Sequence, residues 1–470
     1  MTPKEPTLKI GGRLIVMFIA AVLVLFPPLI FRTPAFALTI PEERKMGDEF
    51  MLQMRVHFRF LEDDFANRFI NDLGHYLVRP LKKVPFPFRF YIIRDDTLNA
   101  FAAPAGHVFF FSGLINIMDT VDELAGVMSH EIGHVAAGHL AQRIEQNKRI
   151  GIATMVGVLA GMLLGGEASQ ALIAASQAAG IQARLNYSRA DERQADQLGF
   201  KFATIAGFDP QGLTGALKKL QGGYWGPDHV PPYLLTHPTG PERMASLDSL
   251  ASLYHPGPPR EETTRFRSDF PLFKTIVCAH SLEPDDAERI FRRQLARHPD
   301  AALPHFGLGI VHIARSEYAM AINELKQALR RHPGTVPILT TLGKAYQLKG
   351  NDAQALRVLE TVLEQEKDNK TALFLSGISY ENMAQYTKAI RLFERLAKAE
   401  SEKNAVYYHL GFSYGKEKRL ALAHYNFGLY FKRVGRPEDA AFHLKKAREL
   451  CRNNPSLMEK IEKALERPAS

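Results

Sequence analysis

The sequence is poor in cysteine, and this scarcity limits the classes of fold that it can encode. Its 470 residues include only two cysteines, Cys278 and Cys451. A fold held together by several disulfides and a zinc site made of cysteines are therefore both excluded. At most one disulfide can form, and the sequence alone leaves open whether these two residues meet.

The chain also lacks a strong charge bias and a long apolar run. Its formal net charge is +9, with no dense basic stripe that carries interleaved aromatic residues. This pattern argues against nucleic-acid binding. Hydrophobic residues make up 46% and charged residues 23% of the chain, as in folded globular proteins. The composition therefore excludes a disordered chain and a polytopic membrane protein.

The first 37 residues have the pattern of a secretory signal peptide. A basic start is followed by an apolar run over 14–26, two prolines and Ala35-Phe36-Ala37. This order is typical of a signal that is cleaved after Ala37. A membrane anchor is the alternative, but the run is shorter than the roughly 20 residues that a spanning helix needs. We therefore expect an exported protein, located in the periplasm of a bacterium.

The second half of the chain repeats with a period of 34 residues. Glycine recurs at this spacing, and alanine follows each glycine by twelve residues: Gly309, Gly343, Gly377, Gly411, Ala321, Ala355, Ala389 and Ala423. This register is that of tetratricopeptide repeats, in which small residues stand where two helices cross closely. The pattern restarts at Gly428, 17 residues after Gly411, so one helix there is expected to serve two neighbouring pairs. Function in this half is expected on the concave surface of the solenoid.

These patterns divide the chain into four segments. They are the signal peptide (1–37), a front domain (38–255), a linker (256–283) and the repeat domain (284–466). The linker is marked by the proline-rich and glycine-rich start of that segment. The predicted fold class is mainly α: an α+β domain of the zincin type, followed by an all-α tetratricopeptide solenoid.

The front domain contains an H-E-x-x-H motif within a stretch of helical periodicity. The motif reads His130-Glu131-Ile132-Gly133-His134. His130 and His134 are four residues apart, so they lie on one helix face and can hold one metal ion. Glu131 projects beside them, where it can reach a water molecule at the metal. This is the arrangement of zinc proteases, although a pair of packed or surface histidines is the alternative.

A third protein ligand is expected from a second helix. Glu192 and Asp196 are four residues apart at the start of a helical stretch that runs to about residue 206. Glu192 can bind the metal, while Asp196 can accept the second ring N–H of a ligand histidine. A solvated helix face is the alternative for this pair. His139 lies five residues after His134, so on a continuous helix it points away, and we assign it to packing or the surface.

Together these motifs resemble the HtpX-related zinc peptidases, and more closely the BepA-type periplasmic proteins that join such a peptidase to a tetratricopeptide domain. The resemblance also rests on Asn99-Ala100-Phe101-Ala102, Gly113-Leu114-Ile115, Tyr187-Ser188-Arg189 and Thr236-His237-Pro238 with Arg243. It implies one Zn²⁺ bound by His130, His134 and Glu192, with Glu131 as the catalytic acid and base. For BepA-type proteins it further implies outer-membrane β-barrel clients and contact with their assembly complex.

The remaining steps of the chemistry have candidate residues. His237, Arg243 and Tyr187 are candidates for the group that stabilises the oxyanion. His237 stands in a loop, so it could complete the metal ligands at rest and leave when substrate binds. The stretch 103–112 is predicted to be a strand, either an exposed edge that pairs with substrate or a buried strand. The apolar segment 150–165 has three readings: a core helix, a lid, or a contact with lipid or client chains.

We therefore expect an exported zinc endopeptidase that cleaves misfolded or unassembled envelope proteins, with clients or partners bound by the repeat domain. Peripheral membrane contact is compatible with this function. The alternative is a tetratricopeptide chaperone or adaptor for envelope assembly with little or no proteolysis.

Overall fold

The structure is a computed structural model that describes residues 39–81, 86–146, 187–222, 230–399, 404–451 and 454–466. The predicted signal peptide (1–37) and the apolar segment 150–165 lie outside these residues. Among the described residues, no helix combines the length and the apolar character that crossing a membrane requires.

A small sheet forms the centre of the front half. Strand β3 (His107–Phe111) lies between β1 (Arg89–Ile93) and β2 (Ala100–Ala103), parallel to the first and antiparallel to the second. All five residues of β3 are buried. The reading of 103–112 as an exposed edge strand is therefore wrong. Both sides of β3 are occupied by neighbouring strands, and the buried alternative holds.

Two helices cross at close distance in the centre of the front half. Helix α5 (Val121–Ala136) begins at Thr120, whose hydroxyl caps Glu123 N–H, and helix α10 (Arg189–Ala206) begins at the capping box of Ser188. A Cβ atom on Gly133 would lie 2.7 Å from the carbonyl oxygen of Ala195. This close crossing, which tolerates no side chain, sets the H-E-x-x-H motif directly against α10.

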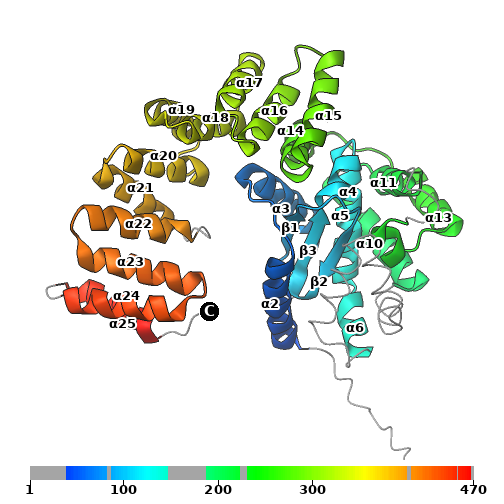
Figure 1. The fold of residues 1–470 in the computed structure, drawn as a ribbon. Helices are drawn as coiled ribbons and strands as arrows, with labels where there is room; N and C mark the ends of the chain where they lie inside the picture. The colour runs from blue at the N-terminus through cyan, green and yellow to red at the C-terminus, as the bar shows by residue number, and fades with distance from the viewer. Residues whose placement is uncertain are drawn as a thin grey trace, which may run out of the picture.

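Further helices enclose the sheet and this helix pair (Figure 1). They are α2 (Ile40–His57), α3 (Asp64–Val78), α4 (Ser112–Ile117), α6 (His139–Gln146), α11 (Gln211–Gly222), α12 (Pro232–Thr236) and α13 (Pro241–Ser252), with the 3-10 turn η1 (Pro104–Gly106) between β2 and β3.

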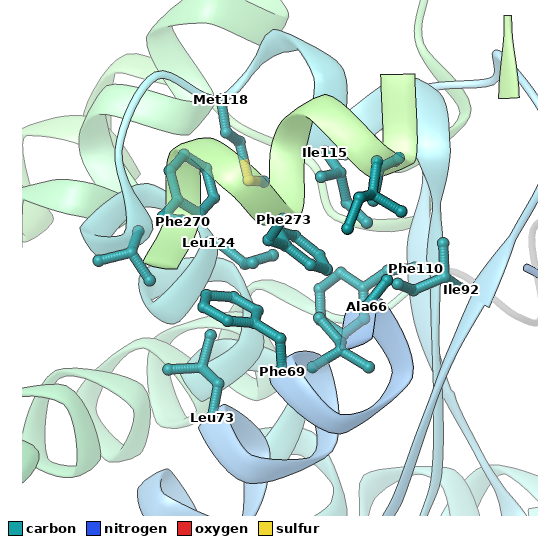
Figure 2. Close-up of a cluster of buried hydrophobic side chains, with 14 of the residues drawn as sticks. Ala66, Phe69, Leu73, Ile92, Phe110, Ile115, Met118, Leu124, Phe270 and Phe273 are labelled. Atoms are coloured by element: carbon teal, nitrogen blue, oxygen red, sulfur yellow. The ribbon is translucent and has the colours of Figure 1, made fainter. Parts of the chain in front are cut away.

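The segment 256–283, predicted to separate the two halves, contains the long helix α14 (Glu261–Ser281). Its aromatic side chains are buried against the front half, and Phe273 stacks on Phe69 with ring centroids 4.3 Å apart. Figure 2 shows Phe270 and Phe273 among Phe69, Met118 and Leu124. The same buried cluster continues into the first repeats through Phe291 and Phe306. The two halves thus share one hydrophobic core.

The second half is a solenoid of antiparallel helix pairs. Its helices are α15 (Pro284–Arg297), α16 (Ala302–Ala314), α17 (Tyr318–Arg331), α18 (Val336–Leu348), α19 (Asp352–Gln365), α20 (Lys370–Asn382), α21 (Tyr386–Lys398), α22 (Ala405–Lys416), α23 (Leu420–Arg433), α24 (Pro437–Leu450) and α25 (Pro455–Glu466). Figure 1 shows them arranged in an arc that curves back toward α2 and α3.

Each repeat glycine faces a large side chain of the following helix. A Cβ on Gly309 or Gly343 would lie 2.6 Å from Leu325 or Leu359, respectively, which is closer than real Cβ atoms approach. Gly411 meets Phe427 of α23 in the same way, and Gly428 of α23 meets Leu444 of α24. Helix α23 therefore packs against both α22 and α24.

Cys278 and Cys451 are both buried free thiols. The disulfide that the composition left open is not formed. Cys278 lies in α14, within the shared core, whereas Cys451 follows α24 at the far end of the solenoid.

The arc also contacts the front half away from α14. The hydroxyl of Thr371, in the first turn of α20, donates a hydrogen bond to the carboxylate of Asp64 at the start of α3. One turn further along α3, Arg68 Nη2 lies 3.7 Å from Glu366 Oε2. The side of α20 that carries Thr371 therefore faces the front half.

Candidate metal centre

Four side chains from three elements converge near the crossing of α5 and α10. They are His130 and His134 of α5, Glu192 of α10 and His237, which follows α12. All four are buried, and each offers one ligand atom within 4.8 Å of those of the others. The three ligands implied by the family resemblance and the histidine proposed to join them at rest are thus brought together.

The spacing of these ligand atoms suits one small metal ion. A tetrahedral ion with ligand bonds of about 2.1 Å holds its ligand atoms about 3.4 Å apart. His130 Nε2 lies 3.0 Å from His134 Nε2 and 3.5 Å from Glu192 Oε2, and His134 Nε2 lies 3.4 Å from Glu192 Oε1. His237 Nδ1 lies 3.3 Å from His130 Nε2 and 3.0 Å from Glu192 Oε1.

Two charged residues outside this cluster hold its members in place. Asp196 Oδ1 lies 2.9 Å from His130 Nδ1, so the carboxylate favours a proton on that nitrogen and leaves Nε2 directed at the cluster. Arg243 of α13 reaches two carboxylates of α10, those of Glu192 and Asp196. Its Nη2 lies 2.8 Å from Asp196 Oδ1 and its Nη1 lies 2.5 Å from Glu192 Oε2. The guanidinium thus joins one member of the cluster, Glu192, to the carboxylate beside His130, while its role toward the oxyanion stays a prediction.

His139 does not point away from His134, so its predicted direction is wrong, whereas the packing alternative holds because the residue is buried and lies outside the ligand group. Its Nδ1 lies 3.0 Å from His134 Nδ1, and its side chain is buried. The expectation assumed a continuous helix through residue 139. Helix α5 instead ends at Ala136, Gly138 adopts a φ of 69°, and a separate helix, α6, begins at His139. The glycine is the signal in the sequence that could have revealed this turn.

Glu131 lies next to the cluster without joining it. Its side chain is fully buried, and within the part of the chain that the structure describes neither carboxylate oxygen has a hydrogen-bond partner. His237 Nε2 lies 3.5 Å from Glu131 Oε1. Burial raises the pKa of this carboxyl, against the opposing effect of His237 and His130. An unpartnered buried carboxylate is costly, so its presence here is consistent with a role in proton transfer.

Aromatic rings enclose His237. The ring of Tyr233 stacks on it with centroids 4.6 Å apart, and the ring of Tyr187 stacks at 5.2 Å. Tyr187 also lies 3.8 Å from the ring of His134, so this candidate electrophile packs against the cluster. Tyr233 escaped the sequence analysis. Its position four residues before His237, one turn of helix away, was the available signal.

The charges of the cluster compensate one another. Burial would raise the pKa of Glu192, but His237 and hydrogen bonds from His130 and His134 hold it far below its usual range. Burial would lower the pKa of His130, but hydrogen bonds to Asp196 and Glu192 raise it to about 9. For His134, burial dominates and the pKa falls well below its usual value. Glu192 and His134 are thus held in the deprotonated and neutral forms that bind metal ions, whereas His130 must release a proton when a metal ion binds.

Comparison with known families identifies the class of each half. Residues 67–251 match the family described as Peptidase family M48. Residues 282–335, 312–376 and 371–401 match families described as tetratricopeptide repeat. The chain therefore carries an M48 peptidase domain followed by tetratricopeptide repeats, and the cluster lies within the peptidase domain.

Curated relatives point to a more particular group. A protein named "Putative beta-barrel assembly-enhancing protease" from Vibrio cholerae is 37% identical over 222 residues, covering 47% of this chain and 46% of that protein. The "Beta-barrel assembly-enhancing protease" of Escherichia coli is 35% identical over 222 residues, with the same coverage. These alignments span about half the length of the relatives. Among solved structures, MamA of Desulfovibrio magneticus is 20% identical, covers 40% of this chain and 97% of its own, and has a TM-score of 0.30.

Proposed function

We propose that this protein is an exported, zinc-dependent endopeptidase that cleaves misfolded or unassembled proteins of the cell envelope. The observation that carries the proposal is the convergence of His130, His134, Glu192 and His237 beside the buried carboxylate of Glu131, which has no hydrogen-bond partner among the described residues. Imidazole and carboxylate ligands in tetrahedral spacing favour zinc among the common divalent ions. Two ligands on adjacent turns of α5 and one on α10 make the site rigid without substrate.

The chemistry divides between the bound ion and the protein. A zinc ion held here would act as a Lewis acid toward water and toward the peptide carbonyl. Glu131 would accept a proton from the attacking water and deliver it to the nitrogen of the leaving amine. Its burial excludes bulk water from this transfer. Arg243 keeps Glu192 and Asp196 in place while these charges shift.

His237 is proposed to control access to the site. The other three ligand residues belong to the long helices α5 and α10, whereas His237 follows the five-residue helix α12. We propose that it completes the ligand set at rest and withdraws when substrate enters. Stacking on Tyr187 and Tyr233 would favour its resting position.

The repeats are proposed to recruit clients or partners. We assign this role to the 284–466 domain, and catalysis to the 38–255 domain. We propose outer-membrane β-barrel proteins as clients, their assembly complex as a partner and the periplasm as the location; the names of the relatives, which refer to β-barrel assembly, support the choice of client. Tyr408 and Phe412 of α22 support a binding role, because these aromatic side chains are 43% and 37% exposed. They occupy the repeat positions of Phe374 and Ile378 in α20, on the helix face that includes Thr371.

The proposed activity is tested with Glu131→Gln in the full chain. The substitution keeps the size of the side chain but removes its basicity. We expect zinc to remain bound at one ion per chain while cleavage of an unfolded protein falls by at least about a hundredfold. Glu242→Gln, at an exposed position of α13, should leave both properties unchanged. Full activity of Glu131→Gln, or no zinc in the native chain, would refute the proposal.

A chaperone or adaptor with little proteolysis is the second candidate, supported by the extent of the repeat solenoid and the exposed aromatic residues on α22. The same substitution separates the two candidates in cells. If cells that carry Glu131→Gln keep normal envelope assembly, binding by the repeats is the main function. If they fail as the deletion fails, proteolysis is required.

A further inference from the structure

The tautomer of His134 must be specified if this residue is to bind a metal ion. A neutral imidazole carries one proton, and the nitrogen that binds metal must be the one without it. His134 directs Nε2 at the ligand cluster, so its proton has to reside on Nδ1. A proton on Nδ1 in a buried site requires an acceptor within hydrogen-bond distance.

His139 supplies this acceptor. Its Nδ1 lies 3.0 Å from Nδ1 of His134, and only 2% of the His139 side chain is exposed. Two facing imidazole nitrogens form a hydrogen bond only if one is protonated and the other is not. His139 must therefore present a lone pair at Nδ1 and carry its own proton on Nε2.

Gln194 of α10 decides which nitrogen of His139 is protonated. Its amide oxygen Oε1 lies 3.0 Å from His139 Nε2, and a carbonyl oxygen can only accept. The Nε2 proton of His139 is thereby fixed, which leaves Nδ1 free to accept from His134. The hydrogen bonds run from His134 to His139 and from His139 to Gln194.

The nearest carboxylate is directed elsewhere. Asp191 Oδ1 lies 3.8 Å from His139 Nε2, beyond hydrogen-bond distance. Its other oxygen is 2.9 Å from Arg143 Nη2 and 3.0 Å from the backbone N–H of Ser188. The acceptor for His139 is therefore a neutral amide, whereas the other ligand histidine, His130, is held by the carboxylate of Asp196.

We propose that His139 and Gln194 are positioning residues that fix the tautomer and ring orientation of His134 for metal binding. This inference rests on the proposed metal site and extends it across the turn at Gly138. It accounts for the buried histidine at the start of α6. It also accounts for the hydrogen bond between this histidine and Gln194 of α10.

The test compares the zinc affinity of full-chain variants by competition with a chromophoric chelator. His139→Leu removes the acceptor and should weaken Zn²⁺ binding by about 10–100-fold, as loss of such partners typically does. His139→Asn places an amide oxygen near the position of Nδ1, so it should restore affinity to within a few fold of the native chain. Gln142→Leu, at an exposed position of α6, is the matched control and should bind zinc normally.

The outcomes separate this inference from the proposed function. If the native chain binds no zinc, the metal site itself fails. If the native chain binds zinc and His139→Leu binds it equally tightly, or if His139→Asn is as weak as His139→Leu, only the positioning role fails. If thermal unfolding shows that metal-free His139→Leu does not fold, Gln194→Leu replaces it. That variant keeps the histidine, and unchanged zinc affinity would then overturn the inference.

Discussion

His237 reaches the ligand cluster from a short helix, and its removal should show whether it restrains the site. A site that is open for only a fraction of the time turns over at a rate reduced to that fraction of its full value. If His237 closes the site nine-tenths of the time, His237→Ala should raise kcat/KM on an unfolded protein up to about tenfold. Steady-state cleavage rates at saturating zinc measure this effect. Unchanged or lower activity would count against a gating role.

Arg243 is the cation that balances two buried carboxylates. Arg243→Gln leaves Glu192 and Asp196 without it, and losing one partner of a buried ion pair costs about 3–5 kcal/mol. The free energy of unfolding in urea should fall by this order. Arg189→Gln removes an exposed pair with Glu242, at 3.9 Å, and should change the free energy of unfolding by less than about 0.5 kcal/mol. Equal losses for the two variants would contradict the positioning role of Arg243.

His107 of β3 should make the front half sensitive to acid. Burial and the nearby Arg89 lower its pKa from 6.5 to about 4. Between these values the unfolded chain binds a proton that the native chain excludes, so stability is complete above pH 6.5 and declines toward pH 4. This shift corresponds to at most about 3 kcal/mol.

Urea unfolding of the native chain and His107→Gln at several pH values measures this contribution. The glutamine does not titrate, so the variant should lose less stability than the native chain between pH 6.5 and pH 4. Parallel pH profiles for the two proteins would show that His107 does not cause the loss.

At the scale of the helix, replacing each of two glycines of α22 by alanine should change the free energy of unfolding in opposite directions. A Cβ on Gly411 would lie 2.8 Å from Phe427 Cδ1, whereas one on Gly415 would meet its nearest atom at 3.9 Å. Gly411→Ala should lose about 1–3 kcal/mol through overpacking, partly offset by the better helix propensity of alanine. Gly415→Ala should gain about 0.5–1 kcal/mol. Thermal unfolding of both variants checks the contrast, and two changes of the same sign would refute it.

Spacing within single helices was readable from the sequence. The four-residue intervals between His130 and His134 and between Glu192 and Asp196 place each pair on one face, because helix geometry is local. The 34-residue period likewise gave the repeats, since each glycine reports a close approach to the next helix. Such features depend on neighbours within a few turns of chain.

Features that depend on where one element ends or which element lies beside it could not be read in this way. His139 turns inward because α5 stops at Ala136, and helix ends are weakly encoded. The central position of β3 follows from strand order, which the apolar pattern of 103–112 does not contain. Tyr233 contacts His237 because α12 is held next to Leu98, whose carbonyl oxygen accepts a hydrogen bond from the Tyr233 N–H at 3.2 Å.

At the scale of the whole molecule, the described residues of the solenoid touch those of the peptidase domain at two separated places. Helix α14 joins them through the shared core, and α20 returns to α3 through Thr371 and Asp64. The first contact is apolar and extensive, so it should persist as long as the chain is folded. The second is polar and lies at the surface, where such pairs contribute little individually. Because the first contact persists in any folded chain, the curvature of the arc should depend on whether this second contact forms.

Thr371→Val combined with Arg68→Glu should open the arc without unfolding either half. The valine removes the hydroxyl that Asp64 accepts, and the new carboxylate faces Glu366, which Arg68 now approaches to 3.7 Å. Small-angle scattering should show a larger radius of gyration, while the urea midpoint changes little. The control pair is Thr361→Val with Arg189→Glu, which applies the same chemistry at exposed positions away from this contact. A radius of gyration equal to that of the native chain would show that α14 alone sets the position of the solenoid.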